Sequence, residues 1–179
     1  DNLSEGILFW RSFLQWFGGI GIIVLALAIL PTLQIGGMQL LHMEHDDPYE
    51  KTLPKIGQFV FEIFLIYLLL TFICAILYFI AGMSSFDSIS HAMTTIATGG
   101  FSTHNNSFSY FNSASIEWIS VLFMIIGSLP FVVYLKSIHG NWRSFFYDDQ
   151  IKLFFILTII IIIITTIWLS INHSENYLV

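Results

Sequence analysis

The stretch SSFDSISHAMTTIATGGFST, residues 84–103, decides the fold. It begins as a helix does, because Ser84 or Ser85 can cap an N-terminus and the Asp87 carboxylate suits the positive end of the helix dipole. About ten helix-compatible residues follow, as far as Ile96. At about 1.5 Å per residue, such a helix covers about half of a hydrocarbon core that is roughly 30 Å thick.

The predicted short helix ends in a loop whose chemistry suits a cation. Two adjacent glycines, Gly99 and Gly100, disfavour a continuing helix and permit positive backbone φ angles. A segment that enters a membrane and turns back in this way needs protein or water around its backbone. The negative C-terminal end of the helix and the carbonyl oxygens that follow it are suitable ligands for a dehydrated cation.

The composition is that of a membrane protein. Apolar residues make up 56% of the 179 residues and charged residues only 10%, with a mean hydropathy of +0.79, whereas a soluble domain has about 25% charged residues. The net charge of −6, with no basic stripe, argues against a nucleic-acid partner. Because the chain begins at Asp1 and an apolar segment follows almost at once, we expect a fragment of a longer protein.

Four apolar stretches surround the short helix and are long enough to cross a bilayer. They are residues 7–30, 56–81, 116–136 and 151–171. The predicted fold class is therefore an all-α membrane protein with four transmembrane helices, one re-entrant pore half-helix and a filter loop. In the first span Arg11 and Gln15 share a helix face that should point at protein. Arg11 either snorkels to the interface or is a buried tether that steadies the pore region.

The third span contains a sequence that interrupts a helix. The interruption is Gly127, Ser128, Leu129 and Pro130. Proline removes a backbone hydrogen bond, and the freed groups need neighbours or water inside a membrane. Two interpretations are open here, a simple proline kink and a non-helical segment that can obstruct or clear an ion path.

Charge distribution predicts the orientation of the chain. Five of the six basic residues lie in or beside the loops at 32–55 and 138–150, so the positive-inside rule places both loops in the cytoplasm and the filter loop outside. In the first loop His42 and His45, beside acidic residues, have the chemistry of metal ligands. A solvated acidic loop is the plainer interpretation.

Two long motifs occur together in this chain. The residues concerned are 10–12 (WRS), 15–16 (QW), 18–25 (GGIGIIVL), 28–31 (AILP), 36–40 (GGMQL), 91–92 (HA) and 95–104 (TIATGGFSTH). They resemble the TrkH family of Trk-type potassium-uptake proteins, within the Trk/Ktr/HKT superfamily, and the resemblance spans nearly the whole chain. Thr-Gly-Gly alone would not be specific.

The resemblance implies a channel-like fold with four helix–pore loop–helix repeats in one chain. In that arrangement residues 1–31 hold the last helix of repeat two, residues 56–137 form the complete repeat three, and residues 151–179 hold the first helix of repeat four. The backbone carbonyls of four residues would form a quarter of the potassium filter, namely Ala97, Thr98, Gly99 and Gly100.

The resemblance also implies functional roles and partners. The break at residues 127–130 would be the family's intramembrane gating loop, although Pro130 departs from the family pattern. Independently of the resemblance, Arg11 and Asp87 are expected from their positions to give structural support to the filter. No cofactor is implied, and potassium is the transported ion. The expected partners are the lipid bilayer of a bacterial inner membrane, the remaining repeats, a second copy of the protein and a cytosolic nucleotide-binding regulatory subunit of the TrkA type.

Two other functions compete with potassium permeation. A membrane-embedded enzyme would use His91, His104 or the pair His42 and His45 with carboxylates, but these histidines fall on both sides of the membrane without a recognisable nucleophile–base spacing. His91 is expected to be a packing or hydrogen-bonding group. A non-conducting scaffold would need neither the Thr-Gly-Gly loop nor the helix break.

Overall fold

The computed structural model describes residues 3–29, 52–138 and 148–175, and every regular element in these ranges is helical. The prediction of an all-α protein is confirmed. The chain divides into two compact units, Asp1–Ser128 and Leu129–Val179, and each is described by itself. The predicted loop around His42 and His45, the GGMQL motif and most of the loop at 138–150 lie outside the described residues.

The first unit is built on two long helices. Helix α1 covers Glu5–Ile29 and α3 covers Thr52–Ile80, close to the first two predicted spans. Within α3, the segment Gln58–Ile80 is long and apolar enough to cross a membrane. Two hydrogen bonds join the helices. The Trp16 indole N–H donates to Thr71 Oγ1 (3.0 Å), and the Tyr67 hydroxyl donates to the Trp16 carbonyl (3.1 Å).

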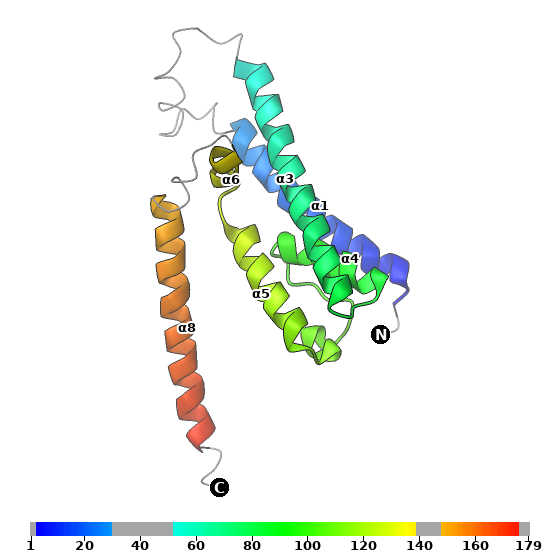
Figure 1. The fold of residues 1–179 in the computed structure, drawn as a ribbon, viewed down its shortest axis with the longest axis vertical. Helices are drawn as coiled ribbons and strands as arrows, with labels where there is room; N and C mark the ends of the chain where they lie inside the picture. Colours follow the sequence, from blue (N-terminus) through cyan, green and yellow to red (C-terminus); the bar gives the residue numbers. More distant parts are fainter. Residues whose placement is uncertain (1–2, 30–51, 139–147, 176–179) are drawn as a thin grey trace. The chain divides into compact units, whose positions relative to one another are not determined.

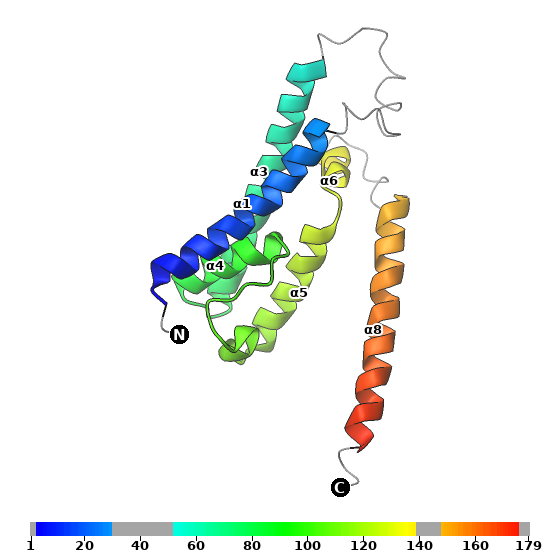
Figure 2. The same cartoon turned by 180° about the vertical axis from the view of Figure 1, so that it is seen from behind.

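A short helix, α4, lies among the longer helices of this unit. It covers Ser85–Ile96 and packs against α1, α3 and α5, as both ribbon views show (Figures 1 and 2). Ser84 is its N-cap, because the Ser84 side chain accepts a hydrogen bond from the Asp87 N–H (3.0 Å). The 12 residues of α4 are too few to cross a bilayer, as the sequence indicated.

The chain returns from α4 through an irregular segment and a 3₁₀ helix, η1, at Ser107–Phe111. Helix α5 follows at Ala114–Ser128 and packs against η1, α3 and α4. Its buried residues Ile116, Ser120 and Phe123 lie three to four positions apart, so one face of α5 is directed at the other elements.

The helix break in the third predicted span is real, but it is shorter than the sequence suggested. Gly127 and Ser128 are the last two residues of α5, and α6 covers Phe131–Ile138. The interruption therefore falls on Leu129 and Pro130. The reason is that glycine and serine are tolerated in a final helical turn, whereas Pro130 has no N–H with which to continue the helix.

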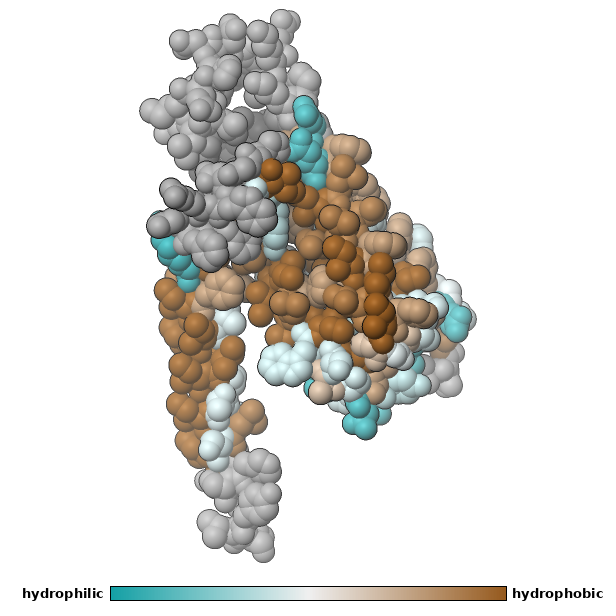
Figure 3. Space-filling view, in the orientation of Figure 1, coloured by the Kyte–Doolittle hydropathy of each residue, from teal (hydrophilic) through white to brown (hydrophobic). Residues whose placement is uncertain are grey.

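The second unit contains α6 and the long helix α8, which covers Asp149–Glu175. A small buried cluster joins these two helices, made of Leu129, Val133 and Ile151 with Tyr134 and Phe154 packed against it. The segment Asp149–Ile171 is long and apolar enough to cross a membrane, and most of its large apolar side chains after Phe154 are exposed (Figure 3). Such a surface suits lipid or further apolar protein, and it agrees with the fourth predicted span.

Candidate ion-binding segment

The backbone turns sharply at the C-terminal end of α4. Three successive N–H groups bond back into the last helical turn, from Ala97 to Met93 (3.2 Å), from Thr98 to Thr95 (3.0 Å) and from Gly99 to Thr94 (2.8 Å). These bonds satisfy carbonyl groups that a helix end normally leaves without a partner. The turn is therefore fixed locally, and the residues after it are free to leave the helix axis.

Left-handed backbone conformations follow, though not at both of the expected residues. Thr98 has a φ of 51° and Gly100 a φ of 71°, while Gly99 lies outside the left-handed region. A threonine adopts this conformation rarely, because its branched side chain crowds the backbone. Its hydroxyl donates to the Ala97 carbonyl (2.8 Å). Thr98, Gly99 and Gly100 are all exposed.

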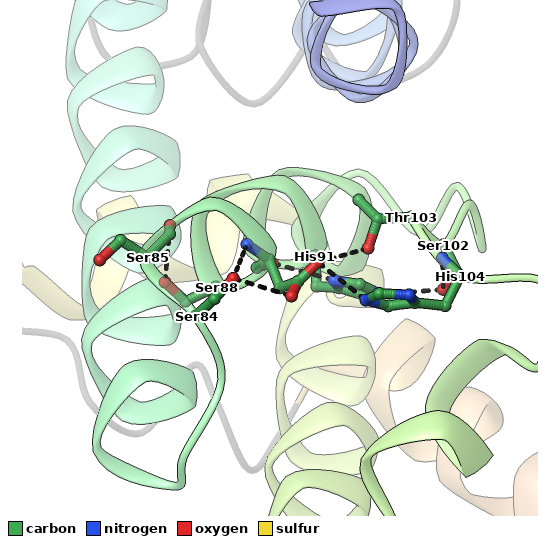
Figure 4. A network of polar contacts seen from close by, with 8 residues as sticks. Ser84, Ser85, Ser88, His91, Ser102, Thr103 and His104 are labelled. Atoms are coloured by element: carbon green, nitrogen blue, oxygen red, sulfur yellow. Dashed lines mark hydrogen bonds and ion pairs between the residues drawn. The ribbon is translucent and has the colours of Figure 1, made fainter. Parts of the chain in front are cut away.

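A network of polar contacts fastens the return segment to the start of α4, and Figure 4 shows Ser84, Thr103 and His104 within it. The group that these three residues share is the Asp87 carboxylate. The Asp87 carboxylate accepts hydrogen bonds from the hydroxyls of Ser84 (2.8 Å) and Thr103 (2.6 Å), and from His104 Nε2 (3.1 Å). Burial opposes the ionisation of Asp87, but these hydrogen bonds outweigh it and hold the carboxyl pKa below its usual value. Asp87 thus connects the two ends of the segment 84–104.

His91 connects the middle of α4 to the same return segment. Its ring is fully buried, and burial lowers its pKa, so the ring is neutral near physiological pH. Nδ1 lies 2.9 Å from the Asp87 carbonyl, which can only accept, so Nδ1 carries the proton and Nε2 accepts from the Ser102 hydroxyl (3.0 Å). Phe108 and Phe111 meet the ring edge to face. The expectation of a packing and hydrogen-bonding role is confirmed.

Two further contacts complete the support of the turn. The Thr94 hydroxyl lies 2.9 Å from the Phe101 carbonyl, and the hydroxyls of Tyr78 and Thr95 lie 3.0 Å apart. On the outer side, the His104 ring stacks on Tyr110 with centroids 3.6 Å apart. These contacts support residues 97–100 on the side of the protein interior, while Thr98, Gly99 and Gly100 stay exposed.

Helix α1 contacts the turn with the face that the sequence indicated. The Arg11 guanidinium lies 4.3 Å from the centroid of the Phe101 ring, and Gln15 Nε2 donates to the Gly99 carbonyl (3.3 Å). Arg11 therefore contacts the segment after the turn, but its side chain is exposed, so the expectation of a buried tether is wrong in its burial. The proximity of Gln15 to Gly99 could not be inferred from residues that are 84 positions apart.

Helix α5 approaches the end of α4 at Gly127. A Cβ atom on Gly127 would lie 2.7 Å from the Ile96 carbonyl oxygen, which is closer than real Cβ atoms come to backbone. Glycine is therefore required for this contact between the two helix ends. Gly127, two residues before Leu129, thus contacts Ile96, the residue that precedes Ala97.

Several supporting residues were not singled out as site residues in the sequence. Thr103 and His104 hold the Asp87 carboxylate, Ser102 holds His91, and Tyr110 covers His104. Their partners depend on how the return segment folds back over α4, which no local pattern encodes. The sequence signal that could have indicated these supporting residues is the concentration of serine and threonine in residues 84–103, within an otherwise apolar chain.

The fold and this segment define a class of protein: an all-helical membrane protein in which a short helix, enclosed by longer ones, ends in an exposed turn of backbone carbonyls. The chain belongs to the TrkH family of cation transport proteins, whose family model matches residues 1–178. The resemblance seen in the sequence motifs is confirmed.

Characterised relatives and a solved structure agree with this assignment. The chain is 41% identical over 179 residues to the Trk system potassium uptake protein TrkH of Vibrio parahaemolyticus, covering 97% of this chain and 37% of the relative. It is 40% identical over 169 residues to the Trk system potassium uptake protein TrkI of Halomonas elongata, covering 94% of this chain and 34% of the relative.

The crystal structure of the potassium transporter TrkH from Vibrio parahaemolyticus is similar to this fold, with a TM-score of 0.81 and 38% sequence identity. That similarity covers 97% of this chain and 35% of the crystallised chain. The chain thus spans about a third of the length of the relatives it matches.

Proposed function

We propose that this chain is part of a potassium-uptake protein, and that the carbonyl oxygens of residues 97–100 line the ion path. The observation that carries the proposal is the end of α4, where the helix stops in an exposed turn with left-handed residues at Thr98 and Gly100. Carbonyl oxygens at such a turn can replace the hydration shell of K⁺, and the negative end of the helix favours a cation.

The state of the carbonyl groups is compatible with this role. The Gly99 carbonyl accepts one long hydrogen bond from Gln15, and the Ala97 carbonyl accepts one from the Thr98 hydroxyl. Each carbonyl oxygen has two lone pairs, so one remains for a cation. In this proposal no side chain takes part in covalent chemistry, and the protein is not an enzyme.

The break after α5 serves as the gate in this proposal. Gly127, Ser128, Leu129 and Pro130 would form an intramembrane loop whose position decides whether the path is open. Support comes from the interruption of the helix at Leu129 and Pro130, and from the contact of Gly127 with the Ile96 carbonyl, one residue before the ion-binding segment.

The remaining organisation follows the family resemblance. Residues 1–31 would close repeat two, residues 56–137 would form repeat three and residues 151–179 would open repeat four. The loops at 32–55 and 138–150 would be cytoplasmic, with the ion-binding segment facing the outside of a bacterial inner membrane. We also propose a homodimer and a cytosolic nucleotide-binding regulatory subunit of the TrkA type.

The competing enzyme function is disfavoured by the state of His91 and His104. Both ring nitrogens of His91 have partners within the fold, and His104 is stacked on Tyr110 and bonded to Asp87. Neither is available to transfer a proton to a substrate without breaking the network that supports the turn. A scaffold would not need an exposed turn at Thr98 and Gly100.

The proposal is tested by uptake in a bacterium that lacks its own potassium-uptake systems. The intact protein that contains this chain is expected to restore growth at limiting potassium and to accumulate a rubidium tracer. It should do so with and without a co-expressed nucleotide-binding partner, to separate a missing subunit from a missing activity. Correct membrane insertion without tracer uptake in either case would contradict the proposal and favour the scaffold function.

A further inference from the structure

One face of α1, made of Arg11, Gln15 and Gly19, lies next to the ion-binding segment. Arg11 contacts Phe101, and Gln15 contacts Gly99. Gly19 comes next, because a Cβ atom on it would lie 3.3 Å from the Ala97 Cβ atom. The three α1 residues are four positions apart, and their partners are two positions apart in the reverse direction.

The segment beside this face is a turn and not an extended strand. Ala97 has right-handed helical backbone angles, and Thr98 and Gly100 are left-handed. Two side chains of α1 reach this turn, Gln15 at Gly99 and Arg11 at Phe101, and hold it against the helix.

Gln15 is the member of this face that contacts a proposed ion ligand directly. Its Nε2 atom donates to the Gly99 carbonyl, while its Oε1 atom is buried and accepts no hydrogen bond from the described residues. A buried amide oxygen without a hydrogen-bond partner costs free energy, although Gln15 as a whole is only half-buried, and the place of this amide beside Gly99 therefore has a use other than stability. The chain keeps glycine at 99, where a Cβ atom would lie 2.7 Å from Gln15 Cδ.

We propose that Gln15 is a positioning residue for cation selectivity: its amide fixes the position of the Gly99 carbonyl. This inference rests on the proposed function, because it needs the Gly99 carbonyl to bind the ion. Loss of the amide leaves the path in place and loosens one ligand, so discrimination between cations falls before transport does.

The test uses the intact protein in proteoliposomes, with rubidium and sodium tracers measured side by side. Gln15→Met keeps the length of the side chain and removes the donor. The expected result is a drop of about fivefold in the rubidium-to-sodium uptake ratio, the size of one net hydrogen bond, with a smaller change in the rubidium rate. Gln58→Met, at an exposed glutamine of α3, is the matched control and should leave the ratio unchanged.

A second variant separates positioning from a general loss of packing. In Gln15→Glu, the introduced carboxyl group donates to the Gly99 carbonyl only while it is protonated. The uptake ratio of this variant should approach that of the unmodified protein at acidic external pH and fall at alkaline pH, whereas the unmodified protein should show no such dependence. This variant also decides the question if Gln15→Met fails to insert.

The outcomes distinguish this inference from the proposed function. If the unmodified protein takes up rubidium but both variants keep its uptake ratio at every pH, Gln15 does not position the ligand and only the inference fails. If the variants lose rubidium and sodium uptake equally, Gln15 has a structural role alone. If the unmodified protein takes up no rubidium, the proposed function fails and the inference with it.

Discussion

Replacing Gly99 by serine in the intact protein is expected to leave folding intact and to lower potassium-over-sodium selectivity by roughly tenfold, since about 1.4 kcal/mol of differential binding is a factor of ten. Gly99 is outside the left-handed region, so its backbone accepts a side chain. The new Cβ atom would meet the Gln15 amide, the movable end of a long side chain, and would push it away from the Gly99 carbonyl.

The matched control for this prediction is Gly18→Ser. Gly18 lies in α1 beside the same region, and a Cβ atom on it would meet nothing within 4 Å. Selectivity is measured from the potassium and sodium inhibition of rubidium uptake, with membrane abundance determined for each variant. Equal selectivity for Gly99→Ser, Gly18→Ser and the unmodified protein would show that residue 99 does not line the path.

Replacing Asp87 by alanine is expected to destabilise the intact protein strongly. The carboxylate accepts hydrogen bonds from Ser84, Thr103 and His104, and Thr103 is only 3% exposed. Thr103 is the buried member of the three, and a buried group that loses its partner costs about 1–3 kcal/mol, so the loss should be about 1–3 kcal/mol. The measurement is the melting temperature of the purified protein in detergent.

Asp149→Ala provides the control for Asp87→Ala. The Asp149 side chain is 95% exposed, and its ion pair with Lys152 (3.1 Å) belongs to a class that contributes little to stability. Its melting temperature should stay close to that of the unmodified protein. If Asp87→Ala melted at the same temperature as Asp149→Ala, the network around the short helix would not support the segment that follows.

Local chemistry made much of the fold predictable. The Ser84 cap, the length of α4 and the helix break next to Pro130 follow from capping, dipole and proline rules that act within a few residues. The long helices follow from uninterrupted apolar sequence. The family motifs extended these local predictions to the proposed function, because the motifs of the first span and of residues 91–104 occur together in one chain.

What could not be predicted depends on contacts between distant segments. The left-handed conformation is found at Thr98 and not at Gly99. The backbone of Gly99 is fixed by two hydrogen bonds, from its N–H to the Thr94 carbonyl and from Gln15 to its own carbonyl. Glycine content shows where such a conformation is permitted, but not which residue adopts it. The partners of Arg11 and Asp87 likewise become known only when α1 and the return segment are placed against α4.

The most direct test of the account is to locate the ion itself. Crystals of the intact protein grown with thallium or rubidium as a potassium substitute should show anomalous scattering beside the carbonyl oxygens of residues 97–100, and this density should weaken when sodium replaces the heavy cation. Such density at these carbonyls would establish the segment as the ion path. A well-ordered segment with no cation beside it, and cation density elsewhere in the protein, would contradict the central claim.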